Sequence, residues 1–465
     1  MSFMIYDIIL LVLFVLFVSV FLYRNKKSLT KEGLLFLYKT SWGMKVIDRV
    51  GKKYTKTLKF LSYISITIGY LLMAGMLYLF GKIVYMYIAY PNIVRAIKVP
   101  PIMPIVPYID KIAPNLNLPS FYFIYFIIIL AIVAIFHEFA HGIFMRRFNI
   151  KIKSTGFGFF PFFLPVFLAA FVEQDENSMK KSSKFEQKAV LSAGTFANLL
   201  TAILGFGIMV LFFSLAFSPA GVQFDSYAYT AVGIGNITAI NGTQLINPNY
   251  QSLLDSVNEK GFSELKTEQG EYIISKDFLE LQQNNKEYVL VYLHAPAIDA
   301  NLDGAIYEIS GEEIKSIKDL SESLENYSLG DEIEIKTTKG NYEIKLGEHP
   351  LNKSKVWLGI FFNEKPKGIV GFFSSFKKPN IYYESNFKAG EFIYDFLWWL
   401  VLISFSVALV NMLPMGIFDG GRFFYLTILG ITKSEKKAKK CFGFMTYFLL
   451  FLVLLLMVFW AMSFL

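Results

Sequence analysis

The chain contains 465 residues, of which 54% are hydrophobic, 17% aromatic and 18% charged, and its formal net charge is +8. This much apolar sequence exceeds what one water-soluble core can hold, which excludes an ordinary soluble domain. The basic residues cluster between apolar runs, so no nucleic-acid partner is expected. A single cysteine, Cys441, excludes an intrachain disulfide framework.

Apolar runs, taken in chain order, predict the membrane-spanning helices. Each run is near or above the roughly 20 residues that a crossing helix needs, and they occupy 3–23, 60–89, 120–145, 189–217, 389–413 and 442–465. The first run is not typical of a signal peptide, because Asp7 lies within it and its basic residues follow it. The sequence therefore predicts a polytopic α-helical membrane protein with about six transmembrane helices in a lipid bilayer, two of them within 1–119.

Charge in the loops predicts the orientation. Residues 24–59, 146–153 and 431–440 are rich in Lys and Arg, whereas 90–119 is rich in Pro and sparsely charged. Lys and Arg accumulate on the cytoplasmic side of short loops. We therefore expect a multi-pass protein of the cell membrane with both termini outside and the polar segment 218–388 extracytoplasmic.

The polar segment contains a pattern of short strands. The stretch "APAIDANLDGAIYEISGEEIKSIKDLSESLE", followed by "GDEIEIKTTKGNYEIKL", alternates strands and turns around one amphipathic helix. It resembles a PDZ domain over 290–347, and "ITAINGTQLINPNYQSLLDSV" indicates a possible second copy in 225–290. We expect an inserted α+β, PDZ-like extracytoplasmic domain in which His294 and His349 have surface roles.

A shorter apolar stretch, "STGFGFFPFFLPVFLAAFVEQDE" at 154–176, does not fit the series of crossings. Glycines and prolines interrupt it, and its apolar part is short for a spanning helix. Non-helical backbone at membrane depth persists only where protein or water covers it. We expect a re-entrant β-hairpin at 154–172 beside a cavity, and a plain interfacial loop is the alternative.

The third apolar run ends in "AIFHEFAHGIFMRR", residues 134–147, which contains two of the four histidines. His137 and His141 are four residues apart, so on a helix they lie on one face and can bind one metal ion. Imidazole suits zinc, which in catalytic sites takes three protein ligands and keeps a fourth position for water. A carboxylate beside that water can take its proton, and Glu138 is placed to do so.

Two histidines leave such a site one ligand short. The candidates are Asp419, in the segment 389–465 that carries the last two crossings, and three carboxylates after the hairpin: Glu173, Asp175 and Glu176. In "NMLPMGIFDGGR", Pro414 and Gly416 break the helix, and the two glycines after Asp419 permit close backbone approach. The crossing that carries the histidines, 120–145, and the crossing that precedes Asp419, 389–413, end on the same predicted side of the membrane. Asp419 is therefore the expected third ligand.

Together these motifs resemble the site-2 protease family of intramembrane zinc metalloproteases, through "HEFAH", "NMLPMGIFDGG" and the PDZ-like insert. The resemblance is close over 120–217 and 389–425. It implies a catalytic membrane core in 120–217, a catalytic base at Glu138, and one Zn²⁺ per chain bound by His137, His141 and Asp419. It also implies cleavage of peptide bonds within transmembrane segments of substrate proteins, near the cytoplasmic side.

The stretch "SAGTFANLL", residues 192–200, is similar to a further motif of that family. The resemblance implies that Asn198 is a catalytic residue that hydrogen-bonds substrate or the developing oxyanion. An interhelical hydrogen bond is the alternative. The family often has proline where Thr195 and Gly416 stand, and these departures affect helix shape.

The hairpin and the insert have expected roles in such a protease. A substrate helix satisfies its own backbone hydrogen bonds, so it must unwind locally before a peptide bond can be reached. Phe157 to Phe171 is expected to border the substrate path and to pair with the unwound segment by strand addition, so that bulky replacements of Gly156 or Gly158 would lower cleavage. The insert is expected to act as a size filter that admits substrates already trimmed by another protease.

Two other classes of protein stay open at this point. Intramembrane His and Asp also mark ion paths, as in a metal-ion transporter, although the polar residues here lie at one depth. A catalytically inactive, protease-derived scaffold with a PDZ domain is the second alternative, although Glu138 has no use in a scaffold. The physiological substrate and the oligomeric state are not defined by the sequence.

Overall fold

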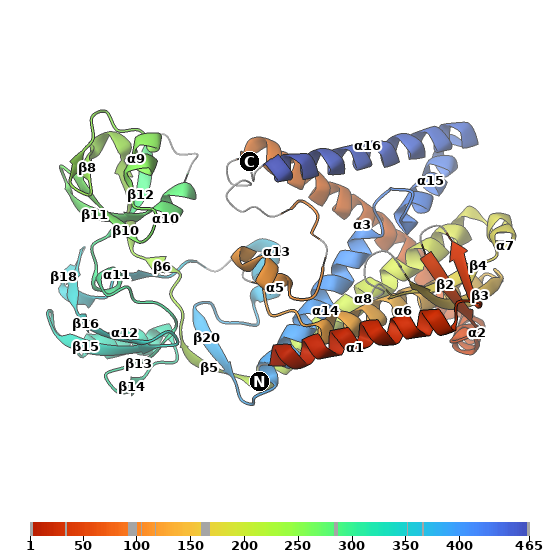
Figure 1. Cartoon of the computed structure of the whole chain (residues 1–465), viewed down its shortest axis with the longest axis horizontal. Helices are drawn as coiled ribbons and strands as arrows, with labels where there is room; N and C mark the ends of the chain where they lie inside the picture. The colour runs from red at the N-terminus through yellow and green to blue at the C-terminus, as the bar shows by residue number, and fades with distance from the viewer. Residues whose placement is uncertain are drawn as a thin grey trace. The chain divides into compact units, whose positions relative to one another are not determined.

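A computed structural model describes residues 3–32, 35–91, 100–103, 105–116, 118–159, 168–282, 287–350, 352–364 and 367–462. The chain forms two compact units, Met1–Leu211 with Phe392–Leu465, and Phe212–Glu391. Within the described residues, six helices are long and apolar enough to span a membrane (Figure 1), which confirms the predicted polytopic architecture: α1 (Phe3–Arg24), α3 (Thr55–Ala89), α6 (Phe123–Arg147), α8 (Lys184–Ala216), α14 (Gly390–Val410) and α16 (Glu435–Met462). The end of the last predicted crossing, 463–465, lies outside the described residues.

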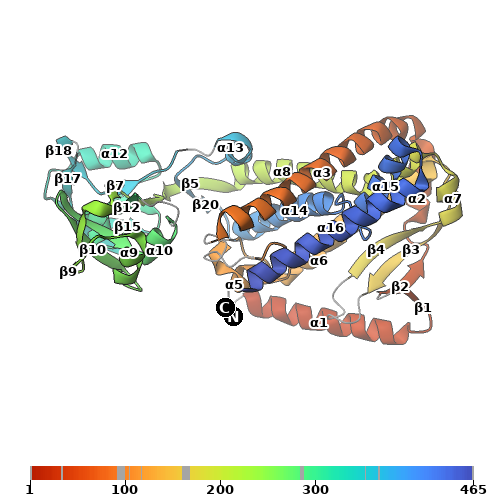
Figure 2. The ribbon, with the colours of Figure 1, turned by 90° about the horizontal axis from the view of Figure 1, so that it is seen from above.

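Four antiparallel strands form a sheet in the order β1-β2-β3-β4. The predicted hairpin is confirmed as the pair β3 (Ile152–Phe159) and β4 (Leu168–Gln174), while its tip at 160–167 lies outside the described residues. The other two strands, β1 (Leu29–Glu32) and β2 (Leu35–Thr40), come from the basic segment after α1, where no strand was predicted. Figures 1 and 2 both place this sheet at one end of the spanning helices, together with the short helices α2 (Met44–Lys53) and α7 (Glu176–Lys181).

The fifth spanning helix is interrupted where the sequence predicted a break. α14 ends at Val410, and α15 (Asp419–Thr432) begins after the irregular segment 411–418, which contains a proline that has no N–H for a helical hydrogen bond. A Cβ on Gly421 would lie 2.1 Å from the carbonyl oxygen of Met415. Only glycine allows this close packing of α15 on the irregular segment, and the packing fixes the position of Asp419.

The second unit contains two main sheets, each with its own hydrophobic core. One sheet has the order β7-β12-β11-β10-β8-β9: β7 (Tyr229–Gly233), β8 (Ile237–Ile240), β9 (Thr243–Gln244), β10 (Phe262–Thr267), β11 (Gly270–Ser275) and β12 (Tyr288–Leu293). The other has the order β16-β15-β13-β5-β20: β5 (Phe217–Val222), β13 (Ile306–Ile309), β15 (Glu332–Thr337), β16 (Asn341–Lys345) and β20 (Ile381–Ser385). An insert that contains sheets is thus present, and its likeness to PDZ domains stays a prediction.

Short strands and helices complete this unit and the loop before α6. The strands are β6 (Ser226–Tyr227), β14 (Glu312–Glu313), β17 (Gly347–His349), β18 (Asn352–Trp357) and β19 (Ile360–Phe361). The helices are α9 (Tyr250–Ser256), α10 (Lys276–Glu280), α11 (Pro296–Asp299), α12 (Ile317–Glu325) and α13 (Gly368–Ser374), with α5 (Ile109–Ile112) in the first unit.

A buried carboxylate joins α1 to the start of α6. Asp7, on α1, is only 2% exposed and accepts hydrogen bonds from the backbone N–H groups of Phe123 at 2.6 Å and Ile124 at 3.0 Å, and from the Tyr108 hydroxyl at 2.8 Å. The N-cap residue of α6, Tyr122, makes no side-chain capping bond. Asp7 therefore caps a helix distant in sequence, and its carboxylate lies favourably near the positive end of the helix dipole.

Replacing this cap should destabilise the membrane unit. Asp7→Ala leaves three donors without their acceptor, and loss of a capping side chain costs about 0.5–2 kcal/mol. We expect a lower thermal unfolding midpoint for Asp7→Ala in detergent, with a smaller loss for Asp7→Asn, which keeps one acceptor oxygen. An unfolding midpoint for Asp7→Ala equal to that of the wild type would show that the cap carries no stability.

Candidate metal centre

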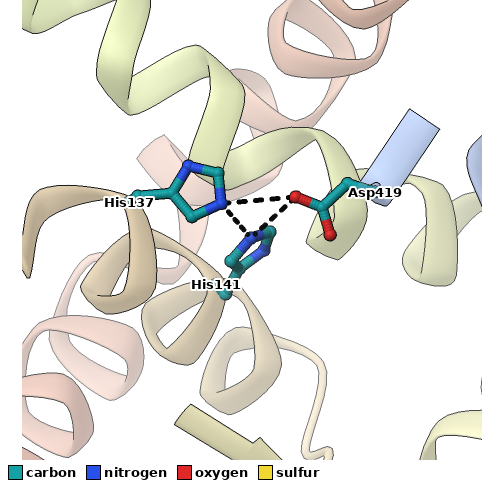
Figure 3. A group of neighbouring side chains, drawn as sticks. All are labelled: His137, His141 and Asp419. Carbon is teal, nitrogen blue, oxygen red and sulfur yellow. Dashed lines mark hydrogen bonds and ion pairs between the residues drawn. The ribbon is translucent and has the colours of Figure 1, made fainter. Parts of the chain in front are cut away.

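The last turns of α6 present both histidines to one point. His137 and His141 are 8% and 7% exposed and lie one helical turn apart. Their Nε2 atoms are 3.0 Å apart, and a dashed line in Figure 3 marks this contact. The predicted pairing of the two rings on one helix face is confirmed.

Asp419, the first residue of α15, completes the group. Its Oδ2 atom lies 3.3 Å from Nε2 of His137 and 3.3 Å from Nε2 of His141 (Figure 3). A tetrahedral ion with bonds of roughly 2.0–2.1 Å separates its ligand atoms by about 3.3 Å. The three side chains are therefore close enough to hold one metal ion, and two imidazoles with a carboxylate are ligands that zinc accepts.

The three other carboxylates considered as third ligand have different partners. Glu173 accepts a hydrogen bond from the Ser154 hydroxyl at 2.6 Å and pairs with Lys39 at 2.9 Å, and these contacts hold its pKa below the ordinary value. Asp175 caps α7, and Glu176 accepts a hydrogen bond from a neighbouring glutamine amide at 2.6 Å. Because these three carboxylates bond to other groups, Asp419 is the one of the four candidates that faces the histidines.

Helix α8 packs against both imidazole rings through three residues spaced four apart, which lie on one helix face. The Val190 carbonyl oxygen is 2.7 Å from Nδ1 of His141, and the Asn198 side-chain amide is 3.0 Å from Nδ1 of His137. Between them, a Cβ on Gly194 would lie 2.5 Å from Nε2 of His141 and 2.6 Å from Nε2 of His137. Gly194 therefore leaves open the space that a metal ion needs.

The sequence alone does not predict the steric role of Gly194. A glycine inside a long apolar helix, four residues before a buried asparagine, was the available signal. That signal has meaning only once the helix is known to lie over the histidines.

Glu138 lies between the metal ligands and the sheet. Its carboxylate accepts a hydrogen bond at 2.8 Å from the backbone N–H of Val172, on β4, which is the edge strand of the sheet. A cavity of about 900 Å³ is lined by Glu138, the three ligand side chains, strand β4 and apolar residues of α6 and α14. The cavity thus joins a metal site, a carboxylate and a strand edge.

The described part of the chain has six helices that can span a membrane, a His-Glu-x-x-His turn and an aspartate on another helix. These features define the class, a multi-pass membrane metalloprotein. The model of Peptidase family M50 matches residues 125–456. The chain therefore belongs to this family, the site-2 protease family, whose members are metallopeptidases. No curated protein matches the chain significantly.

A methyl group at position 194 should block the metal site. Gly194→Ala places Cβ too close to both Nε2 atoms, while alanine itself favours the helix by roughly 0.5–1 kcal/mol. We expect bound metal per purified chain, measured by mass spectrometry of the element, to fall about tenfold or more, as for other lesions around metal ligands.

Gly207→Ala is the matched control for this variant. It lies on the same helix, where an added Cβ would meet nothing within 4 Å. It should keep the metal content of the wild type, and full metal content in Gly194→Ala would contradict the steric role of Gly194.

Proposed function

We propose that the protein is a zinc-dependent intramembrane endopeptidase that hydrolyses peptide bonds within transmembrane segments of other proteins. The observation that carries this proposal is the convergence of His137, His141 and Asp419, with Glu138 beside them, on one cavity among spanning helices. Membership of a metallopeptidase family supports it. Zinc is the proposed metal because two imidazoles and a carboxylate are a ligand set of catalytic zinc sites.

Glu138 is the proposed catalytic base. Bound zinc supplies a Lewis acid that polarises the scissile carbonyl and lowers the pKa of a water. Glu138 takes the proton from the attacking water and passes it to the departing amine. The Val172 N–H, 2.8 Å away, holds the carboxylate on the cavity side of β4.

Strand β4 is the proposed seat of the unwound substrate. The N–H of Val172 points away from β3, toward Glu138. Backbone groups alternate in direction along an antiparallel strand, so those of Ala170 also point to the outer edge. Edge groups of this kind pair with an extended peptide, and strand addition here would hold a substrate next to the metal ligands.

The proposed orientation follows the distribution of charge. Glu138, next to His137, contacts strand β4 of the sheet. Figures 1 and 2 place that sheet at the same end of the spanning helices as α2 and α7, and both short helices end in lysines. Lys and Arg favour the cytoplasmic side, so we place the metal site near that side of the cell membrane. The second unit is then extracytoplasmic and PDZ-like, and it would act as a size filter for substrates trimmed by another protease.

Glu138→Gln tests the proposed reaction. The amide keeps the shape of the side chain but does not take a proton, so cleavage of single-pass model proteins in proteoliposomes should fall by roughly 10²–10⁴-fold. Zinc content should equal that of the wild type, and mass spectrometry of the products should place the cut within the membrane segment. Cleavage by Glu138→Gln at the wild-type rate would contradict the catalytic role of Glu138. A zinc-loaded wild type that cleaves none of the substrates would favour the catalytically inactive, protease-derived scaffold.

Ala170→Pro tests strand addition. Proline removes an N–H from the outer edge of β4, and the predicted result is slower cleavage with zinc content unchanged. Ala170→Val is the control, since it keeps the N–H and suits a strand. Equal cleavage by both variants would argue against pairing at this edge. Gly156 is less suitable for such a test, because a Cβ there would lie 2.1 Å from the Tyr38 carbonyl oxygen and would disturb the sheet itself.

A further inference from the structure

We propose that Asn198 is a positioning residue that acts through His137. Its side-chain oxygen accepts a hydrogen bond from Nδ1–H of that ring, and Nε2 is therefore left unprotonated, with its lone pair available to the metal. This inference rests on the metal site of the proposed function. It differs from the role that the family resemblance implies, in which Asn198 bonds to the substrate. The two roles predict different effects on zinc binding.

The neighbouring ligand shows what such a site requires. His141 places Nδ1 2.7 Å from the carbonyl oxygen of Val190, which can only accept a hydrogen bond. Nδ1 must therefore carry the proton of the neutral ring, and Nε2 keeps a lone pair that faces His137 and Asp419. A metal-binding histidine usually has its second nitrogen fixed in this way.

His137 needs an acceptor in the same place. Its Nε2 faces the common point, and its Nδ1 lies 3.0 Å from Nδ2 of Asn198. In that orientation the amide donates to Nδ1, so the ring proton resides on Nε2, where it blocks a metal. The other end of the amide, Oδ1, is buried and has no hydrogen-bond partner among the described residues.

A half-turn of the amide resolves both problems. The oxygen and nitrogen of a carboxamide occupy nearly equal volumes, and their placement follows the hydrogen-bond network. After the turn, Oδ1 accepts from Nδ1–H of His137, and Nε2 is free to bind a metal. The orientation of Asn198 is thus coupled to metal binding through one proton.

The position of Asn198 agrees with this role. The side chain is fully buried, and it lies on the face of α8 that also carries the Val190 carbonyl and Gly194. One face of α8 therefore contacts Nδ1 of each histidine and leaves room between the two Nε2 atoms. Sequence spacing alone assigns no partner to Asn198.

Zinc affinity of the full-length protein in detergent, measured by competition with a chelator, separates the two roles. Asn198→Leu has no acceptor, and it should weaken zinc binding by roughly 10–100-fold, as for other residues that orient metal ligands. Asn198→Asp keeps an acceptor and should bind within about threefold of the wild type. Thr195→Ala, a buried change one turn earlier on α8 whose hydroxyl donates only to a helix carbonyl, is the control and should bind as the wild type does.

Three results would overturn the proposal. Wild-type affinity in Asn198→Leu, with slower cleavage, would assign Asn198 to the substrate instead. Equal weakening in Asn198→Asp and Asn198→Leu would show that packing matters and the acceptor does not. The same loss in Thr195→Ala would show a general effect of changes in this helix.

A measurement on the wild type covers the case in which the variants fail to fold. The chain has four histidines, so nitrogen NMR of the zinc-loaded, histidine-labelled protein can resolve each ring. Both His137 and His141 should carry a proton on Nδ1, and an unprotonated Nδ1 on His137 would contradict the proposal. Neither readout needs peptide cleavage, so a chain that binds zinc as described and cleaves nothing would refute the protease and leave this inference standing.

Discussion

The close approach of three ligand atoms from two separate helices is the constraint on which the rest of the structure depends. Two imidazole nitrogens and a carboxylate oxygen lie 3.0–3.3 Å apart within a membrane unit, where unpaired polar groups are costly. The break before α15 brings Asp419 to this point. Gly194, on α8, leaves the space between the ligand atoms open. The metal site therefore also requires residues that neither bind the metal nor take part in a reaction.

The other end of α6 is fixed by a different interaction. Asp7 belongs to α1, which precedes the segment matched by the family, 125–456. Its carboxylate nevertheless caps the helix that carries the histidines. Likewise, β1 and β2 precede the matched segment but extend the sheet whose edge strand meets Glu138. The N-terminal segment is thus an integral part of the membrane unit.

Features encoded locally could be predicted from the sequence. Asp419 could also be placed near the histidines, because a proline and glycines mark a helix break on the same predicted side of the membrane. Other contacts between distant segments could not be predicted. Spanning helices follow from the length of apolar runs, and the metal pair follows from the i, i+4 spacing of His137 and His141. Strands β1 and β2 escaped prediction because they are short, lie in a basic segment and join the sheet through the pairing of β2 with β3, more than a hundred residues later. The cap by Asp7 has the same origin, since an aspartate in an apolar run does not identify its partner.

The number of zinc ions per purified chain, after metal is supplied, tests the metal centre most directly. We expect about one zinc in the wild type and in Glu173→Ala, and loss of that zinc in His141→Ala and Asp419→Ala. Glu173 is the appropriate control because it lines the same cavity but pairs with Ser154 and Lys39. A folded wild type without zinc, or an Asp419→Ala variant that keeps it, would contradict the central claim that these three side chains form the metal centre.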